Sequence, residues 1–204
     1  RDGRSNILTS SKINSGDLWL YELDEIWEYL IDNAKLGSVC QLHRGIEWQS
    51  GYQSKAVSQK QEAGYAEGVH GIRREGFYQY VLPGTEYLDS REEHLRGGAS
   101  GLPWAEDKLL FNAVRLSRGP WKLAAVVDRK GLVASQQFIA CWPNSDCKFS
   151  LEMLAAIINS PIASAFVANY DRRKRFRIET IKHLPLPESL LDEKIEILIN
   201  EYIE

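Results

Sequence analysis

Features that define several large classes of protein are missing from this 204-residue chain. No apolar run approaches the roughly 18 residues that a membrane-spanning helix needs, and the charged start at residues 1–4 is not the apolar core of a signal peptide. The three cysteines, Cys40, Cys141 and Cys147, are few and widely spaced, which favours reduced thiols over a disulfide framework. We therefore expect a cytoplasmic protein that does not enter a membrane.

The common catalytic and metal-binding motifs are also missing. The chain has no Cys-x-x-Cys pair and its four histidines are scattered, so no metal site is predicted. It contains no Pro-Pro, and therefore no Asn/Asp-Pro-Pro-aromatic tetrapeptide of the kind that holds a flipped adenine in DNA methyltransferases. It has neither a nucleotide-binding Gly-x-x-x-x-Gly-Lys-Ser/Thr loop nor a Gly-x-Ser-x-Gly nucleophile turn. We predict no catalytic residue in this chain.

One pattern resembles the acid-x-Lys trio of metal-dependent nucleases. Residues 106–108 and 192–194 both end in a lysine two positions after an acid. With 26% charged residues such tripeptides arise by chance, and neither follows an Asp at the end of an expected strand. The nuclease interpretation is therefore a minor alternative.

Charge is distributed unevenly along the chain, although the net charge is only −3. Residues 17–47 hold seven acidic and two basic side chains, and residues 188–204 hold six and one. Residues 107–187 hold thirteen Lys and Arg against six Asp and Glu. A basic centre between acidic ends is compatible with a polyanionic partner, whereas the plainer alternative is a solvated surface.

Hydrophobic periodicity predicts the elements of the first half. Apolar residues at helical spacing predict a helix over 18–34, and a short half-apolar run at 36–42 ends at Gly45, where we expect a sharp turn. Residues 49–75 have little periodicity, which predicts a long loop or a set of short strands.

The second half contains clearer β and helical segments. Strands are predicted at 77–82, 109–116, 121–127 and 132–142, the last two joined as a hairpin by the turn 128–131. Helices are predicted at 150–159 and 162–170, separated by Pro161, with a final acidic helix over 188–204. This order indicates an α/β fold of the α+β type, with a mixed, largely antiparallel twisted sheet and flanking helices.

The aromatic residues and one histidine admit two roles each. Trp48 and Trp104 could stack on nucleic-acid bases or pack in the core, and His43 fits a hydrogen-bonded structural role better than a catalytic one. The other four tryptophans are predicted to be buried in the core: Trp19, Trp27, Trp121 and Trp142.

Five motifs, taken in order, resemble the C-terminal specificity domains of N6-adenine DNA methylases. They are Leu36-Gly37 leading to His43-Arg44-Gly45, Lys108-Leu109-Leu110 with Arg115, Trp121 to Asp128, Leu154 to Pro161, and Leu184-Pro185-Leu186-Pro187. Ile158 departs from the leucine that usually precedes Asn-Ser in this family. The likeness covers about residues 17–190 and extends to the recognition domains of type I restriction specificity subunits.

This resemblance implies a target-recognition domain that reads a short sequence in double-stranded DNA and carries no chemistry of its own. We expect residues 1–16 to be a linker from a missing upstream domain, 17–187 the recognition domain and 188–204 a C-terminal helix. It also implies a fused or separate methyltransferase partner that would hold S-adenosylmethionine, and restriction subunits as further partners. No cofactor is expected in this chain.

The candidate DNA-binding residues form two groups. The basic run at 172–177 would neutralise phosphates, and each contact would add roughly 0.9 to the slope of log affinity against log salt. Residues of the loop after Gly45 would read bases. Arginine suits both tasks because its planar fork binds bidentately. The candidates are Arg44, Trp48, Gln49, Gln53, Lys55, Arg73, Arg74, Lys108, Arg115, Arg172, Arg173, Lys174, Arg175 and Arg177.

Two alternatives remain open at this stage. The basic run could be the solvated end of a helix, stabilised by the helix dipole. The chain could also be a protein-interaction domain whose acidic ends dock a partner and whose basic centre is incidental, and a type I specificity subunit would combine both roles.

Overall fold

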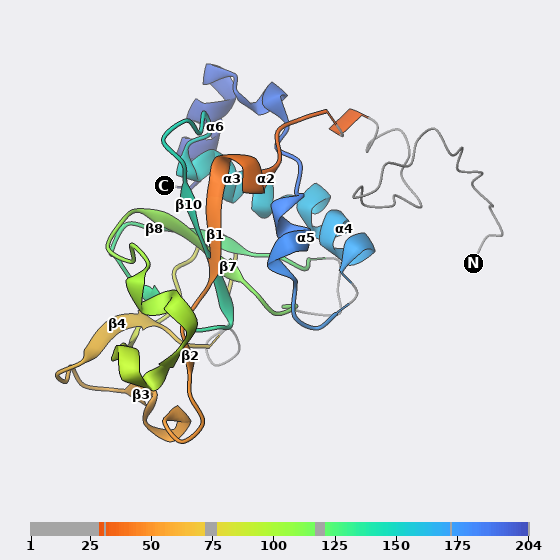
Figure 1. Cartoon of the computed structure of the whole chain (residues 1–204). Helices are drawn as coiled ribbons and strands as arrows, with labels where there is room; N and C mark the ends of the chain where they lie inside the picture. Colours follow the sequence, from red (N-terminus) through yellow and green to blue (C-terminus); the bar gives the residue numbers. More distant parts are fainter. Residues whose placement is uncertain (1–28, 31, 72–76, 117–120, 172, 204) are drawn as a thin grey trace.

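A computed structural model of the chain describes residues 29–30, 32–71, 77–116, 121–171 and 173–203. Its centre is a four-stranded sheet in the order β1-β10-β7-β8, in which every neighbouring pair is antiparallel (Figure 1). The strands are β1 (Cys40–Arg44), β10 (Phe138–Pro143), β7 (Lys108–Asn112) and β8 (Ala125–Asp128).

Helices form a layer on one face of this sheet, which we call the helical layer. Its main members are α3 and α4, and the hydroxyls of Ser150 and Ser160 each accept a hydrogen bond at the helix start. Pro161, predicted to separate the two helices, is the first residue of α4. The helices are α2 (Leu36–Val39), α3 (Leu151–Ile158), α4 (Pro161–Tyr170), α5 (Ile178–Lys182) and α6 (Glu193–Ile203), with a 3-10 turn, η5, at Glu188–Leu190.

Short strands form a second unit on the opposite face, which we call the lobe. It contains a two-stranded ribbon, β2-β6, and a four-stranded sheet in the order β3-β5-β4-β9, in which only β4 and β9 are parallel. The strands are β2 (Glu47–Trp48), β3 (Val57–Ser58), β4 (Tyr65–Val69), β5 (Glu86–Asp89), β6 (Leu95–Arg96) and β9 (Val133–Ala134). Two 3-10 turns connect lobe strands, η2 (Gln53–Lys55) and η3 (Glu92–His94), and a third, η4 (Gly97–Gly101), follows β6 on the way to β7.

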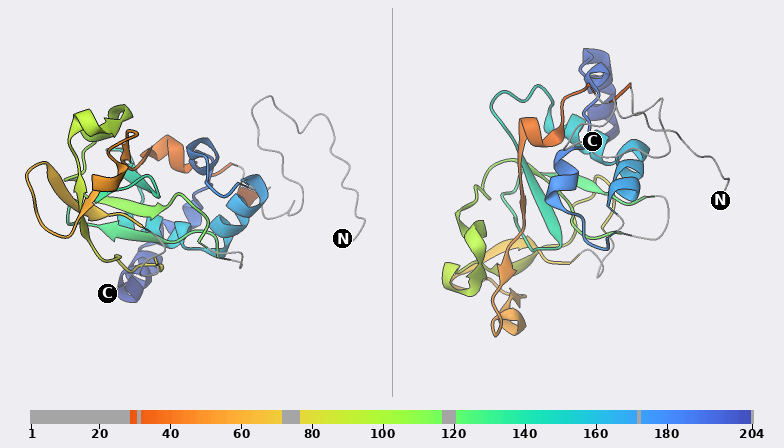
Figure 2. Two further views of the ribbon diagram at one scale, coloured as in Figure 1. Left: turned by 90° about the horizontal axis from the view of Figure 1, so that it is seen from below. Right: turned by 45° about the vertical axis from the view of Figure 1, so that its right-hand side comes forward.

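Alternating side chains of the central sheet supply two separate cores. Leu109 and Phe111 of β7 face the helical layer, while Leu110 packs against the lobe. In β10, Ile139 joins the helical core and Ala140 the lobe core. The central strands are therefore buried on both faces. In the right-hand view of Figure 2 the lobe lies at the lower left, and the helices lie above it and to its right.

The α+β class and the largely antiparallel sheet agree with the sequence prediction, but the predicted hairpin is wrong. Strand β8 pairs with β7, and β10 lies between β7 and β1. After β8 the chain turns away because the Asp128 carboxylate accepts hydrogen bonds from the backbone N–H groups of Lys130 and Leu132, both at 2.9 Å. The next strand, β9, then joins the lobe sheet.

Other predictions have mixed outcomes. The strand over 77–82 is wrong: Tyr80 has a φ of 62°, which breaks an extended conformation, and only an isolated bridge joins Tyr78 and Val81. Short strands in 49–75 and a final helix are confirmed. Trp142 is buried as predicted, whereas Trp121 is 46% exposed. Trp19, Trp27 and most of the predicted helix 18–34 lie outside the described residues.

The described part of the chain contains no single helix long and apolar enough to cross a membrane. Only α3 and α4 taken together, bent by 57°, meet that test of length and composition.

Candidate nucleic-acid interface

The cationic run after α4 folds into a tight loop around one buried carboxylate. Asp171 is 1% exposed; its Oδ1 accepts a hydrogen bond from the N–H of Arg173 at 3.2 Å, and its Oδ2 accepts one from the N–H of Arg177 at 2.7 Å. This anchors both ends of residues 171–177, which we call the basic loop. The backbone is thus held from inside while most of its charged side chains face solvent.

Backbone hydrogen bonds join the basic loop to the segment that directly follows β7 in the central sheet. The N–H of Arg115 donates to the carbonyl of Lys174 at 3.0 Å, and the N–H of Phe176 donates to the carbonyl of Ala113 at 2.9 Å. Phe176 is fully buried in the helical core. A single apolar anchor therefore sits between exposed cations, which explains why an aromatic residue interrupts the charged run.

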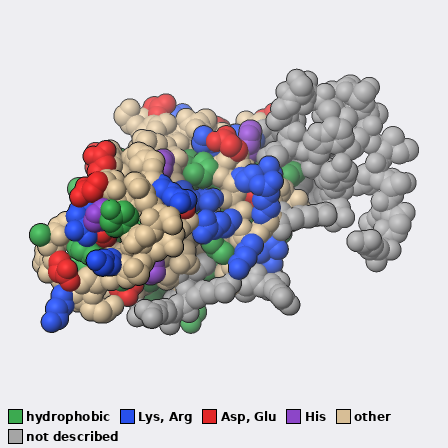
Figure 3. Space-filling view, turned by 60° about the horizontal axis from the view of Figure 1, so that its bottom comes forward, with side chains coloured by type: hydrophobic (Ala, Val, Ile, Leu, Met, Phe, Trp, Pro, Cys, Tyr) green, Lys and Arg blue, Asp and Glu red, His purple; other side chains and the backbone are tan. Residues whose placement is uncertain are grey.

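Most of the described cations on the basic loop have no acidic partner in the described part of the chain. Arg173, Lys174 and Arg175 are exposed, and none of them pairs with a carboxylate of the described residues. Arg177 differs, because its Nε lies 3.7 Å from Asp171. Figure 3 shows Lys and Arg side chains gathered across the middle of the face seen there. Uncompensated positive charge on one face attracts polyanions.

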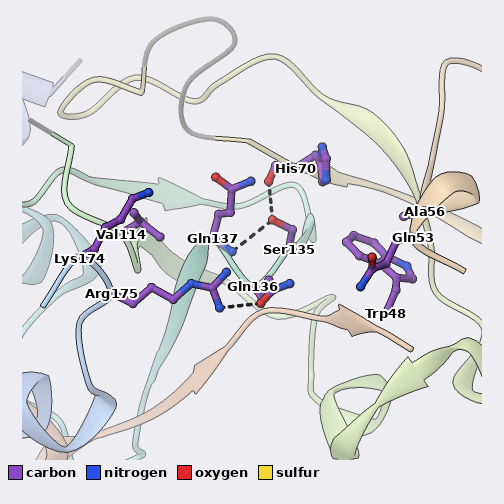
Figure 4. A pocket seen from close by; sticks show the side chains of 10 residues that line it. All are labelled: Trp48, Gln53, Ala56, His70, Val114, Ser135, Gln136, Gln137, Lys174 and Arg175. Atoms are coloured by element: carbon purple, nitrogen blue, oxygen red, sulfur yellow. Dashed lines mark hydrogen bonds between the residues drawn. The ribbon is translucent and has the colours of Figure 1, made fainter. Parts of the chain in front are cut away.

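A groove of about 650 Å³ lies beside the basic loop, where the lobe meets the central sheet. In Figure 4, Lys174 and Arg175 lie at one end, Gln136 and Gln137 in the middle, and Trp48 at the other end. The full lining is Trp48, Gln53, Ala56, His70, Val114, Ser135, Gln136, Gln137, Lys174 and Arg175.

The floor of the groove is a close backbone crossing between β1–β2 and β9–β10. The N–H of Ile46 donates to the carbonyl of Ala134, and the N–H of Gln136 donates back to the carbonyl of Ile46, both at 2.8 Å. A Cβ on Gly45 would lie 2.2 Å from the carbonyl oxygens of Ala134 and Ser135. Gly45 is therefore required by close approach, and not by the sharp turn that the sequence suggested.

Hydrogen bonds from the lobe hold the groove walls. The Ser135 hydroxyl donates to the carbonyl of His70, and the Trp48 indole N–H donates to the carbonyl of Asp89 at 2.9 Å. Trp48 is only 4% exposed, so it shapes the groove as part of the lobe core and offers little surface for stacking on a base.

Arg44 lies under the basic loop. Its Nη2 donates to the carbonyl of Phe176 at 2.6 Å, and burial, together with the nearby positive charge of Arg175, lowers its pKa. Arg44 thus adds positive potential beneath the rim of the groove while its side chain is half-buried.

The structure brings together only some of the sequence candidates. Trp48, Gln53, Lys174 and Arg175 line the groove, with Arg44 beside them. These five come from segments that are far apart in the sequence, as the proposed grip by the loop after Gly45 and the basic run requires.

Other candidates have different roles or positions. Gln49 donates its amide to the carbonyls of η3 and β6, and Lys55 lines a second hollow on the lobe. Arg115 is half-buried under the basic loop and donates to the carbonyl of Asp171 at 3.0 Å. Arg73, Arg74 and Arg172 lie outside the described residues.

The prediction that Lys108 binds DNA is wrong. Lys108 is fully buried, and its Nζ lies 2.7 Å from Oδ2 of Asp128, so it cannot reach a duplex. Its neighbour Asp107 is exposed and pairs with Arg129 at 2.6 Å. The side chains of the nuclease-like trio at 106–108 therefore do not form one site, and no cluster of three possible metal ligands occurs among the described residues.

Sequence reasoning missed four polar residues of the groove. Gln136 and Gln137 fall between the apolar runs of β9 and β10, inside a segment that looked like one continuous strand. A Ser-Gln-Gln step in such a run could have indicated a break. The missed residues are His70, Ser135, Gln136 and Gln137.

No protein-family model and no curated protein matches this chain. Among solved structures it is similar to the HsdS subunit from Thermoanaerobacter tengcongensis, with a TM-score of 0.48 and 12% identity over 83% of this chain and 37% of that one. It is also similar to the S subunit of a type I restriction-modification system from M. genitalium, with a TM-score of 0.43 and 9% identity over 88% and 42%. The chain spans less than half the length of either.

Proposed function

We propose that this chain is a recognition module for double-stranded DNA. The observation that carries the proposal is a row of three exposed cations, Arg173, Lys174 and Arg175, that have no acidic partner among the described residues. Two of them, Lys174 and Arg175, line a groove that also carries amide side chains. Cations of this kind neutralise phosphates and set the position of a duplex, whereas amides offer a donor and an acceptor for base edges.

The finer assignment rests on the order of the sequence motifs. In this assignment the chain is the recognition domain of an adenine-specific DNA methyltransferase or restriction-modification enzyme. The chain itself is not catalytic. A fused or separate methyltransferase domain would bind S-adenosylmethionine, and restriction subunits would be further partners in the cytoplasm. The basic loop supports the binding part of this assignment, because its exposed cations offer a surface to phosphates.

A second candidate function is partner docking through α6. The helix is acidic and leaves Ile197, Leu198 and Tyr202 exposed by 51%, 63% and 74%. Exposed apolar side chains on an otherwise charged helix suit contact with another protein. This role is compatible with DNA recognition, as in a subunit that binds both.

Salt-dependent binding to duplex DNA tests the main proposal. We expect the affinity of the full chain to fall steeply between low and physiological salt. The triple variant Arg173→Ala/Lys174→Ala/Arg175→Ala should reduce the slope of log affinity against log salt by roughly 2.7, at roughly 0.9 per lost phosphate contact.

A matched control removes the same charge from another surface. Lys130, Lys148 and Lys194 are exposed and lie outside the groove. Their replacement by alanine should change the slope of log affinity against log salt by less than the roughly 0.9 expected for one phosphate contact. Equal effects of the two triple variants, or no salt-dependent binding of the wild type, would contradict DNA recognition and leave docking through α6 as the better account.

A further inference from the structure

Three glutamines from two distant segments line the groove, Gln136 and Gln137 in its middle and Gln53 at the end near Trp48. Gln53 belongs to η2 of the lobe, while Gln136 and Gln137 join β9 to β10. A glutamine amide has one acceptor and one donor group side by side. That pair matches the donor N6 and the acceptor N7 on the major-groove edge of adenine.

The amide of Gln136 has a defined orientation. Its Oε1 accepts a hydrogen bond from Nη1 of Arg175 at 2.8 Å, and since a guanidinium only donates, the oxygen must face the arginine. Among the described residues, no further group hydrogen-bonds to the Nε2 group or to the second lone pair of Oε1. Arg175 thus connects the cationic end of the groove to the amides in its middle, as Figure 4 shows.

The backbone of Gln137 is held by hydrogen bonds, whereas its side-chain amide has no hydrogen-bond partner among the described residues. Its N–H donates to the Ser135 hydroxyl at 3.3 Å, and its carbonyl accepts from the N–H of Ala113 at 2.7 Å. Within the described ranges, no group hydrogen-bonds to the side-chain amide of Gln137 or of Gln53. An amide that lines a groove on a rigid backbone and has no internal partner is suited to an external one.

We propose that Gln137 and Gln136 are specificity-determining residues that read adenine, with Arg175 as the positioning residue of Gln136. This inference rests on the proposed DNA recognition and names the base that it selects. Each residue would contact one adenine bidentately, which discriminates against another base by about 5- to 150-fold. Gln53 faces the same groove from the lobe side and would contribute at its edge.

Selection from a randomised duplex pool tests the inference with the full chain. The wild type should enrich sequences with adenine at two positions. In Gln137→Glu the carboxylate only accepts hydrogen bonds and would take one from N4 of cytosine, so one of those positions should change from adenine to cytosine. The control Gln41→Glu adds the same charge to an exposed side chain near the start of β1 and should leave both preferences unchanged.

A second variant separates positioning from charge. Arg175→Lys keeps the positive charge but loses the fork that holds Gln136. We expect its salt slope to match the wild type, while adenine enrichment weakens at the position that Gln137→Glu does not change.

The outcomes distinguish the two proposals. Salt-dependent binding without any base preference, or a preference that neither Gln137→Glu nor Gln136→Glu alters, would overturn the adenine assignment and leave DNA binding standing. Absence of binding to any duplex would overturn both.

Discussion

The two faces of the central sheet are built by different means. The helical face is closed by long apolar stripes of α3 and α4 with side-chain caps at both helix starts. The lobe face is closed by strands of two to five residues, by a backbone crossing at Gly45, and by hydrogen bonds around buried polar groups such as Asp89 and Ser135. Local periodicity thus accounts for one face, and long-range polar contacts account for the other.

The candidate interface lies where these two constructions meet. Lys174 and Arg175 belong to the connection between α4 and α5, while Trp48 and Gln53 belong to the lobe. The groove therefore depends on the lobe keeping its place on the sheet. Substitutions on the two faces should therefore differ in how much they lower stability and duplex binding. The expected effects are given below from the largest to the smallest.

The buried pair of Lys108 and Asp128 should give the largest effect, because it lies where the chain leaves the central sheet for the lobe. Both side chains are fully buried and 2.7 Å apart. Lys108→Met leaves the Asp128 carboxylate without its cation and should lower the free energy of unfolding by about 3–5 kcal/mol. Urea denaturation measures this. The double variant Lys108→Met/Asp128→Asn should recover part of the loss, and no recovery would show that packing, not charge, holds this turn.

Substitution at the crossing should come next. Gly45→Ala places a Cβ 2.2 Å from two backbone carbonyl oxygens, which cannot move without separating the lobe from the sheet. We expect a loss of about 1–3 kcal/mol or more, together with loss of duplex binding. Gly98→Ala is the matched control, since a Cβ there meets nothing within 4 Å and the φ is negative. If the two variants had similar stability, the backbone crossing at Gly45 would not be what holds the lobe on the central sheet.

Acid should weaken the lobe through Asp89. Burial alone raises its pKa, but hydrogen bonds from Arg91 and His94 outweigh burial and hold the pKa at about 2. Because this lies below the unfolded value of about 3.9, the stabilisation is complete above pH 4 and is lost as the pH falls towards 2. The loss should be about 2 kcal/mol. Urea midpoints of the wild type should therefore fall more steeply between pH 4 and 2 than those of Asp89→Asn; parallel curves would exclude this role.

A cap in the helical layer should give the smallest effect. The Ser150 hydroxyl accepts from the N–H of Met153 at the start of α3. Ser150→Ala should lower stability by about 1 kcal/mol without changing duplex affinity, because the groove does not depend on this helix start. Ser150→Asp keeps an acceptor and should restore stability. A drop in DNA affinity in Ser150→Ala would show that the two faces are coupled.

The two faces also differ in how far the sequence predicts them. Ser150, Ser160 and Pro161 act within a few residues, so the starts of α3 and α4 are readable from local sequence. The strand that pairs with β10 cannot be predicted from local sequence. It is β1, which lies about a hundred residues away in the chain, and another apolar strand would satisfy the same pattern. The wrong hairpin at 128–131 has this cause, since Asp128 makes a turn whose direction depends on Lys108.

The candidate site shows the same division. Exposed cations in the basic loop were predictable from composition, whereas Lys108 looked equivalent to them and is a core residue. The glutamines of the groove were not predictable, because polar residues inside an apolar run carry no periodic pattern. Their role depends on Arg175, which reaches them from another element.

By itself the sequence determined the α+β class, the main helices, the asymmetry of charge and the presence of a cationic loop, since these follow from neighbouring residues. Only the tertiary structure decided which cations face solvent, which strands meet, and that Trp48, Gln136 and Arg175 share one groove. The physical reason is that burial and hydrogen-bond pairing are set by residues far away in the chain, and the same lysine can serve as a surface charge or as half of a buried pair.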